Sequence, residues 1–193
     1  MISITPFWRD TEFTPEEHWL IKSLGEAHKK SADRANISSV TVANAAVGSR
    51  DYGKSVAAAI LTLGDLHGPI EQCYDLLANN AYLPVPEENG LVPGWGNSFI
   101  KGEPDPIWET VDERLKKSTY GNRIREITKT LHTMGKKIYP NPACYTAATA
   151  LTIGMPKRIA SYLFLASRLE HWTMIFLNHT DKDSRLAKGL SWA

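Results

Sequence analysis

Residues 61–69, LTLGDLHGP, lie between two segments of helical periodicity and contain the histidine His67. Residues 51–63 repeat apolar side chains at the spacing of an amphipathic helix. A second apolar pattern follows Pro69, a residue type that is tolerated in the first turn of a helix. We therefore expect two helices joined by a short turn that carries His67.

The rest of the chain is also mostly helical in pattern. Thr14, followed by Pro15 and two glutamates, is a signal for a helix start. Residues 37–42 are rich in β-branched side chains, but a single isolated strand would have no partner, so we expect a helix there. Residues 156–178 form the longest apolar helical pattern. Shorter helices are expected at 105–115, at 122–134 with Gly135 after its end, and at 146–153.

Composition excludes several functional classes. A length of 193 residues with 42% apolar side chains fits one domain with a packed core. A net charge of +1 gives no electrostatic reason to expect a nucleic acid or an acidic membrane as partner. No apolar run is long enough to span a bilayer, and the first residues lack a secretory signal pattern. Cys73 and Cys144 have neither metal-ligand nor disulfide-framework spacing, so we expect a cytoplasmic protein without a metal site.

A stretch rich in proline and glycine, residues 84–104, interrupts the helical pattern. Such a stretch is either a linker between domains or a functional loop. Within it, PGWGN at residues 93–97 places two glycines around a tryptophan, which favours backbone brought close to another group.

Several segments, taken in order, resemble the citrate synthase and citryl-CoA lyase family. Residues 61–69 resemble its L-x-G-P-L-H-G-G segment and are similar to the L-L-T-I-G-D form of the citrate-cleaving lyases. The other matches are VPGWGN at 92–97 to x-x-G-x-G-H, Asp105-Pro106 to D-P-R, KKIYPNPA at 136–143 to K-x-x-Y-P-N-V-D, LFLASR at 163–168 with Trp172 to F-A-x-x-R-x-x-G-W, and, more weakly, DRANIS at 33–38 to H-E-x-N-x-S.

The resemblance covers about residues 24–179 and implies an all-α, citrate synthase-like fold. In that fold a large helical domain and a small helical subdomain enclose a cleft. Residues 1–193 would form a single unit, truncated at the N-terminus because family members are longer. About 70–155 would contribute the small subdomain and the cleft loops, 156–179 the long C-terminal helix, and 180–193 a tail. The resemblance also implies a homodimer built on antiparallel helices.

The family's reaction joins acetyl-CoA to a 2-oxo acid, or reverses that condensation, and it needs a base, an enol stabiliser and a ketone polariser. By resemblance, His67 is the enol stabiliser. Asn97 stands where the family has its ketone-polarising histidine, and its amide can still donate a hydrogen bond. Ala143 stands in place of the aspartate base, and alanine can carry out no proton chemistry.

The resemblance also assigns ligand-binding residues. Arg168 and Asn141 would bind substrate, Arg168 through a carboxylate, because arginine holds carboxylates bidentately. Gly94, Gly96 and Lys101 would lie against a coenzyme A thioester, which acts as a co-substrate and is not held permanently. Ile107 replaces a second family arginine.

Three hypotheses follow from this mixture of kept and lost residues. The protein is an acyltransferase or lyase with altered chemistry on an acyl-CoA or carboxylate ligand. Alternatively, it is a non-catalytic relative with a binding, regulatory or scaffolding role. In the third hypothesis it acts as the partner of a full-length relative.

Overall fold

The computed structural model describes residues 8–32, 37–64, 67–79, 90–97, 100 and 102–180, with backbone only for residues 29–32. These residues form helices and contain no strand beyond two isolated β-bridges, Trp95–Pro140 and Asn97–Ile100. The helices are α1 (Pro15–Ala32), α2 (Ile37–Ser49), α3 (Tyr52–Leu61), α4 (Ile70–Ala78), α5 (Ile107–Thr110), α6 (Glu113–Lys117), α7 (Thr119–Thr133), α8 (Pro142–Thr152), the 3₁₀ helix η1 (Lys157–Ile159) and α9 (Ser161–Thr180).

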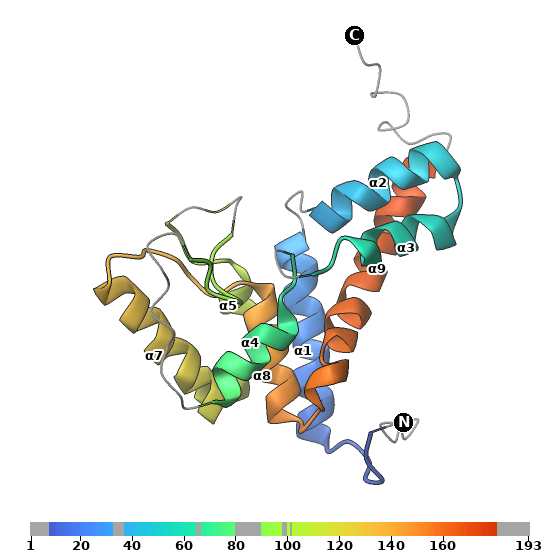
Figure 1. Cartoon of the computed structure of the whole chain (residues 1–193). Helices are drawn as coiled ribbons and strands as arrows, with labels where there is room; N and C mark the ends of the chain where they lie inside the picture. The colour runs from blue at the N-terminus through green and yellow to red at the C-terminus, as the bar shows by residue number, and fades with distance from the viewer. Residues whose placement is uncertain are drawn as a thin grey trace.

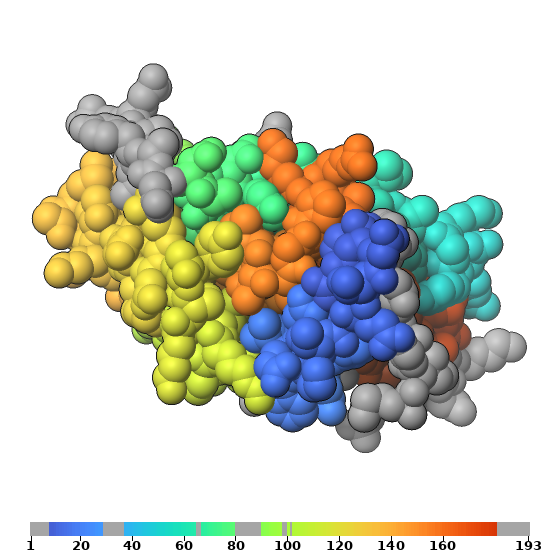
Figure 2. Space-filling view, turned by 90° about the horizontal axis from the view of Figure 1, so that it is seen from below, coloured from blue at the N-terminus to red at the C-terminus, as the bar shows by residue number. Residues whose placement is uncertain are grey.

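Helix α8 lies at the centre of the packing. Every residue from Ala143 to Ala150 is buried, and most of them are alanine or threonine. Small side chains let neighbouring helices approach closely, and α8 contacts α1, α4, α6, α7 and α9. Figure 2 shows the orange residues that include α8 enclosed by α4 in green, the yellow region of α6 and α7, and α1 in blue.

Two groups of helices extend from this centre in opposite directions (Figure 1). On one side, α2 and α3 pack on each other and on α9, around Val42, Ala59 and Trp172. We call α2, α3 and the C-terminal half of α9 the helical arm. On the other side lie α5, α6 and α7 with the loop that begins at residue 90. The segment between α3 and α4 that carries His67 joins the arm to the centre.

Helix starts predicted from the sequence are confirmed by their capping bonds. The Thr14 hydroxyl accepts a hydrogen bond from the Glu17 amide, and the Glu17 carboxylate accepts one from the Thr14 amide, which together form a capping box at α1. Residues 37–42 are helical, as expected. Gly135, with a φ of +80°, follows the end of α7.

The helix expected at 105–115 is instead broken into α5 and α6. Val111 is extended, with φ −65° and ψ 136°, and the Asp112 carboxylate caps α6 by accepting from the Arg114 amide at 2.7 Å. A short aspartate side chain competes well for backbone amides, so it starts a new helix where apolar periodicity alone predicted continuation. The long C-terminal pattern is confirmed, although it begins with η1 before α9 starts at Ser161.

Within the described ranges, no helix has the combination of length and apolar character needed to cross a membrane. The same residues contain no group of three or more His, Cys, Asp or Glu side chains arranged to hold a metal ion.

Candidate functional site

Three side chains from different parts of the chain surround the ring of Phe164 on α9. The His28 ring, from α1, lies edge-on at 5.1 Å between centroids, and the His67 ring lies edge-on at 6.5 Å. The Arg168 guanidinium carbon, one helical turn after Phe164, lies 5.2 Å from the ring centroid. Residues separated by more than a hundred positions therefore form one cluster, which we call the Phe164 cluster.

Arg168 is a buried cation that, within the described part of the chain, lacks a hydrogen-bonded counterion. Its side chain is 3% exposed, and its Nε and Nη1 atoms are buried without a hydrogen-bond partner. Burial lowers the pKa of its guanidinium to about 10, opposed by the negative charge of Asp105, so Arg168 is still protonated at neutral pH. A buried charge with unsatisfied donors is costly, and a ligand carboxylate that accepts a hydrogen bond from the guanidinium would offset this cost.

His67 is half-buried beside this charge. Its Nε2 atom is buried and has no hydrogen-bond partner among the described residues. Burial, and then the positive charge of Arg168, lowers the pKa of its imidazole below the usual 6.5. His67 is therefore neutral at pH 7. Its backbone is held by a turn in which the Gly64 amide donates to the His67 carbonyl at 2.9 Å.

His28 was not among the residues that the sequence indicated. It is fully buried, and its Nε2 lies 3.1 Å from the Thr146 hydroxyl, which itself donates to the Pro142 carbonyl. Nε2 must then carry the proton, leaving Nδ1 as a buried acceptor for which the described residues offer no donor. Burial, followed by the charge of Arg168, places the pKa of His28 well below 6.5. Its position four residues after Leu24, on the buried face of α1, was the available sequence signal.

The loop at residues 92–97 is hydrogen-bonded to the segment before α8. The Gly96 amide donates to the Tyr139 carbonyl at 2.8 Å, and the Asn141 amide donates to the Gly94 carbonyl at 2.9 Å. The Asn141 side chain joins both elements, because its Nδ2 donates to the Gly96 carbonyl and its Oδ1 accepts from the Ala143 amide. Asn141 therefore caps α8 and holds the loop, while its predicted contact with substrate stays a prediction.

The two loop glycines differ in their surroundings. Gly94 has a φ of +84°, and a Cβ there would lie 2.4 Å from the Cys73 sulfur, so packing inside the protein already requires glycine. Gly96 has a φ of +90°, a Cβ added there would meet no atom of the described residues within 4 Å, and it lines a small cavity of about 150 Å³. Gly96 is thus open to a ligand. Lys101, the third residue predicted to contact coenzyme A, lies outside the described residues.

Asn97 is tied to a buried carboxylate. Its Nδ2 donates to Asp105 Oδ2 at 3.1 Å, while Asp105 Oδ1 accepts from the Ile107 amide at 3.0 Å. Among the described residues, Asp105 is the only buried carboxylate, and its charge acts on Arg168. The sequence indicated Asp105 as a helix start and as part of the segment that resembles D-P-R, but it gave the carboxylate no role, so its contact with Asn97 is a finding of the structure.

Ala143 occupies the second position of α8 and is 3% exposed. It has no group that can accept a proton. Its neighbour Cys144 is fully buried, and burial places the pKa of that thiol well above its usual value, so Cys144 offers no thiolate at neutral pH. The described residues therefore include unsatisfied hydrogen-bond donors, but the position to which the resemblance assigns the base is apolar.

Two solved structures share this architecture. A citryl-CoA lyase from Hydrogenobacter thermophilus superposes with a TM-score of 0.70 at 18% sequence identity, over 93% of this chain and 75% of the lyase. This is a citrate synthase-like fold. A citrate synthase from Thermoplasma acidophilum, solved as a ternary complex with carboxymethyl coenzyme A and oxaloacetate, superposes with a TM-score of 0.67 at 21% identity, over 91% of this chain and 51% of the synthase.

The all-α, citrate synthase-like fold predicted from the sequence is thus confirmed. At these identities the similarity establishes the fold alone, and the chain spans about three quarters of the lyase and half of the synthase. No family model matches the sequence, and no curated protein sequence matches it.

The buried histidines predict how stability depends on pH. Because the pKa of His28 and of His67 is lowered by folding, both rings are neutral in the folded and unfolded protein at pH 7.5. Below about pH 6.5 the unfolded chain takes up protons first, so the free energy of unfolding should fall. For fully buried His28 the slope is about 1.4 kcal/mol per pH unit, and it is smaller for half-buried His67.

Urea unfolding at pH 7.5, 6.5 and 5.5 measures this dependence. A His28→Gln variant should show a flatter profile over the same range, because glutamine does not titrate. An equal slope in the wild type and the variant would contradict the assignment.

Proposed function

We propose that this protein binds a small carboxylate ligand in the Phe164 cluster, from the class of 2-oxo acids, citrate and their coenzyme A thioesters. The observation that carries the proposal is Arg168, a buried guanidinium with two unsatisfied nitrogens beside the unsatisfied Nε2 of His67. The citrate synthase-like fold supports the choice of ligand class.

In this proposal each polar group has a distinct task. Arg168 binds a carboxylate of the ligand through charge-assisted hydrogen bonds from its guanidinium. Neutral His67 donates a hydrogen bond to the thioester oxygen, where charge develops when the enol forms or the carbon–carbon bond breaks. Asn97, held by Asp105, donates to the ketone oxygen. A neutral amide polarises that oxygen less than a charged histidine would.

Ordinary condensation also requires a base, and Ala143 supplies none. The absence of a carboxylate at this position favours a reaction that begins without proton abstraction from acetyl-CoA, such as cleavage of an acyl-CoA. It equally favours the second candidate function, a non-catalytic protein that binds the same ligands in a regulatory or scaffolding role, including as the partner of a full-length relative. Both candidates share the carboxylate site.

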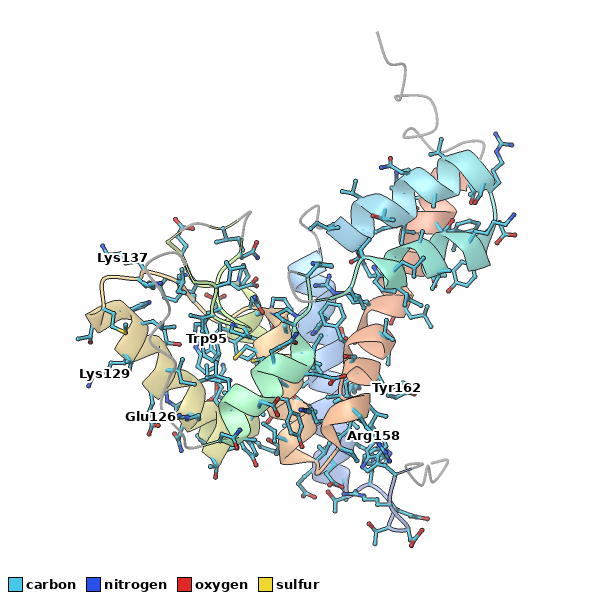
Figure 3. All side chains as sticks on the ribbon, in the orientation of Figure 1. Trp95, Glu126, Lys129, Lys137, Arg158 and Tyr162 are labelled. Atoms are coloured by element: carbon cyan, nitrogen blue, oxygen red, sulfur yellow. The ribbon has the colours of Figure 1, made fainter. Side chains whose placement is uncertain are left out.

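Ligand binding tests the proposal without assuming turnover. We expect oxaloacetate or citrate, at about 100 times its dissociation constant, to raise the melting temperature by roughly 5–10 °C. Coenzyme A and acetyl-CoA are tested alone and with each acid. Arg168→Gln should abolish the shift caused by the acids, whereas Arg158→Gln, at an exposed arginine of η1 (Figure 3), should leave it unchanged. No shift with any of these ligands would overturn the proposal.

Restoring the carboxylate tests the assignment of Ala143. We expect Ala143→Asp to increase thiol release from acetyl-CoA and oxaloacetate by about 10²-fold or more, because a positioned base contributes roughly 10²–10⁴. Ala143→Asn has the same shape without basicity and is the matched control. The gain should disappear when His67→Ala is added. If Ala143→Asp binds both ligands and releases no more thiol than Ala143→Asn, the missing base is not what limits turnover.

We also propose that the helical arm forms a homodimer. Apolar side chains are exposed along all three of its helices, and Leu61 at the end of α3 is 85% exposed. An apolar surface on an extended pair of helices is typical of an interface. Sedimentation equilibrium should give the dimer mass, and Leu61→Lys should shift it toward the monomer. Leu91→Lys, at a leucine 75% exposed in the loop, should not. A monomeric wild type contradicts this proposal.

We further propose a cytoplasmic location, which is consistent with the cysteines. Cys73 and Cys144 are both free and buried. Reduced, unbridged thiols fit a reducing compartment. Cell fractionation with a tagged chain would test the location directly.

A further inference from the structure

A pocket of the structure lies outside the Phe164 cluster and is larger than the cavity at Gly96. It is a pocket of about 630 Å³ between α7, the start of α5 and residues 139–145. None of the members of the Phe164 cluster lines it. Its volume is within the range of pockets that hold small organic ligands.

Aromatic rings form much of its wall. Trp108 and buried Tyr145 lie with centroids 5.5 Å apart and planes tilted by 32°. Tyr139 meets His132 edge-on at 4.8 Å. All four residues line the pocket. The two ring pairs offer apolar faces against which a flat aromatic group can stack.

The rim of the pocket on α7 is basic. Arg125 and Lys129 are exposed and one helical turn apart, so they project on one side of the helix. The Arg125 guanidinium is anchored to the Lys116 carbonyl at 2.6 Å and to Asn122. Among the described residues, no hydrogen bond or ion pair involves the Lys129 ammonium. Figure 3 shows Lys129 on α7 near Glu126, whose carboxylate lies 3.6 Å from Arg123.

Asp105 is the only acid among the described residues that line the pocket, and its two oxygens already accept hydrogen bonds from Ile107 and Asn97. The pocket therefore presents an excess of positive charge. His132 hydrogen-bonds through Nε2 to the Ile138 carbonyl, so it acts there as a donor and is held in place. The charge that remains available to a ligand is that of Lys129, with the anchored Arg125 beside it.

We propose that this pocket binds a small planar aromatic anion, with its ring against Trp108 and Tyr139 and its acidic group at Lys129. A nucleoside phosphate and an aromatic carboxylate share this chemistry. The inference does not depend on the proposed function of the Phe164 cluster.

Isothermal titration calorimetry of the full chain with AMP and with indole-3-acetate tests the proposal. We expect at least one of them to bind, and the one that binds identifies the acidic group as phosphate or carboxylate. Adenosine and indole, which lack the charge, should bind at least about tenfold more weakly. Lys129→Glu should weaken binding of the anion at least about tenfold, because it replaces attraction with repulsion. Lys54→Glu, at an exposed lysine of α3 in the helical arm, should leave it unchanged.

Any one of the following results would overturn the proposal. The first is no binding of either anion at millimolar concentration. The second is that Lys129→Glu and Lys54→Glu weaken binding of the anion equally. A further one is that the charged and uncharged compounds bind equally well. The last is competition by acetyl-CoA, which would assign the pocket to the ligand of the first site. Binding of AMP or indole-3-acetate to the Arg168→Gln variant separates the two sites, because that variant tests only the Phe164 cluster.

Discussion

Close packing around α8 is the constraint on which the rest of the structure depends. Its run of buried alanines and threonines leaves room for five other helices to approach. Two of those helices, α1 and α9, supply His28, Phe164 and Arg168, and α8 itself supplies Thr146, which fixes the His28 ring. Larger side chains in α8 would separate α1 from α9 and disperse the cluster, since a packed interior transmits such changes.

The electrostatics of the cluster follow from this packing. Burial around α8 removes water from Arg168, and the nearby positive charge then helps to keep both His28 and His67 neutral. The negative charge of buried Asp105 acts against the lowering of the Arg168 pKa by burial. The same carboxylate accepts a hydrogen bond from the Asn97 side chain. The Asp105 carboxylate therefore contacts the loop at 92–97 through Asn97 and acts on Arg168 of α9 through its charge alone.

The groups proposed to bind a ligand lie apart from position 143, to which the resemblance assigns the base. Of the donors that the resemblance to the citrate synthases predicted, His67 and Arg168 meet at Phe164, and Asn97 is linked to them through Asp105. The N-terminal turn of α8, where a carboxylate would be favoured by the helix dipole, presents Ala143 instead. Asn141, Gly94 and the hydrogen bonds around them keep the loop and α8 together without a ligand. The scaffold of the site thus does not depend on a carboxylate at position 143.

Sequence by itself determined the helical class, because apolar periodicity and local caps such as Thr14 with Glu17 act within a few residues. Ordered motifs also predicted the citrate synthase-like fold and singled out His67, Asn97, Asn141 and Arg168. Only the tertiary structure decided that His28 joins the cluster, that Asp105 binds Asn97, and that Gly94 is required by Cys73. These depend on how the folded chain brings α1, α4, α9 and the loop at 92–97 together, and helical periodicity does not specify such contacts. The break between α5 and α6 was missed for a local reason. The Asp112 side chain caps α6 and starts a new helix, although the apolar periodicity around it predicts one continuous helix.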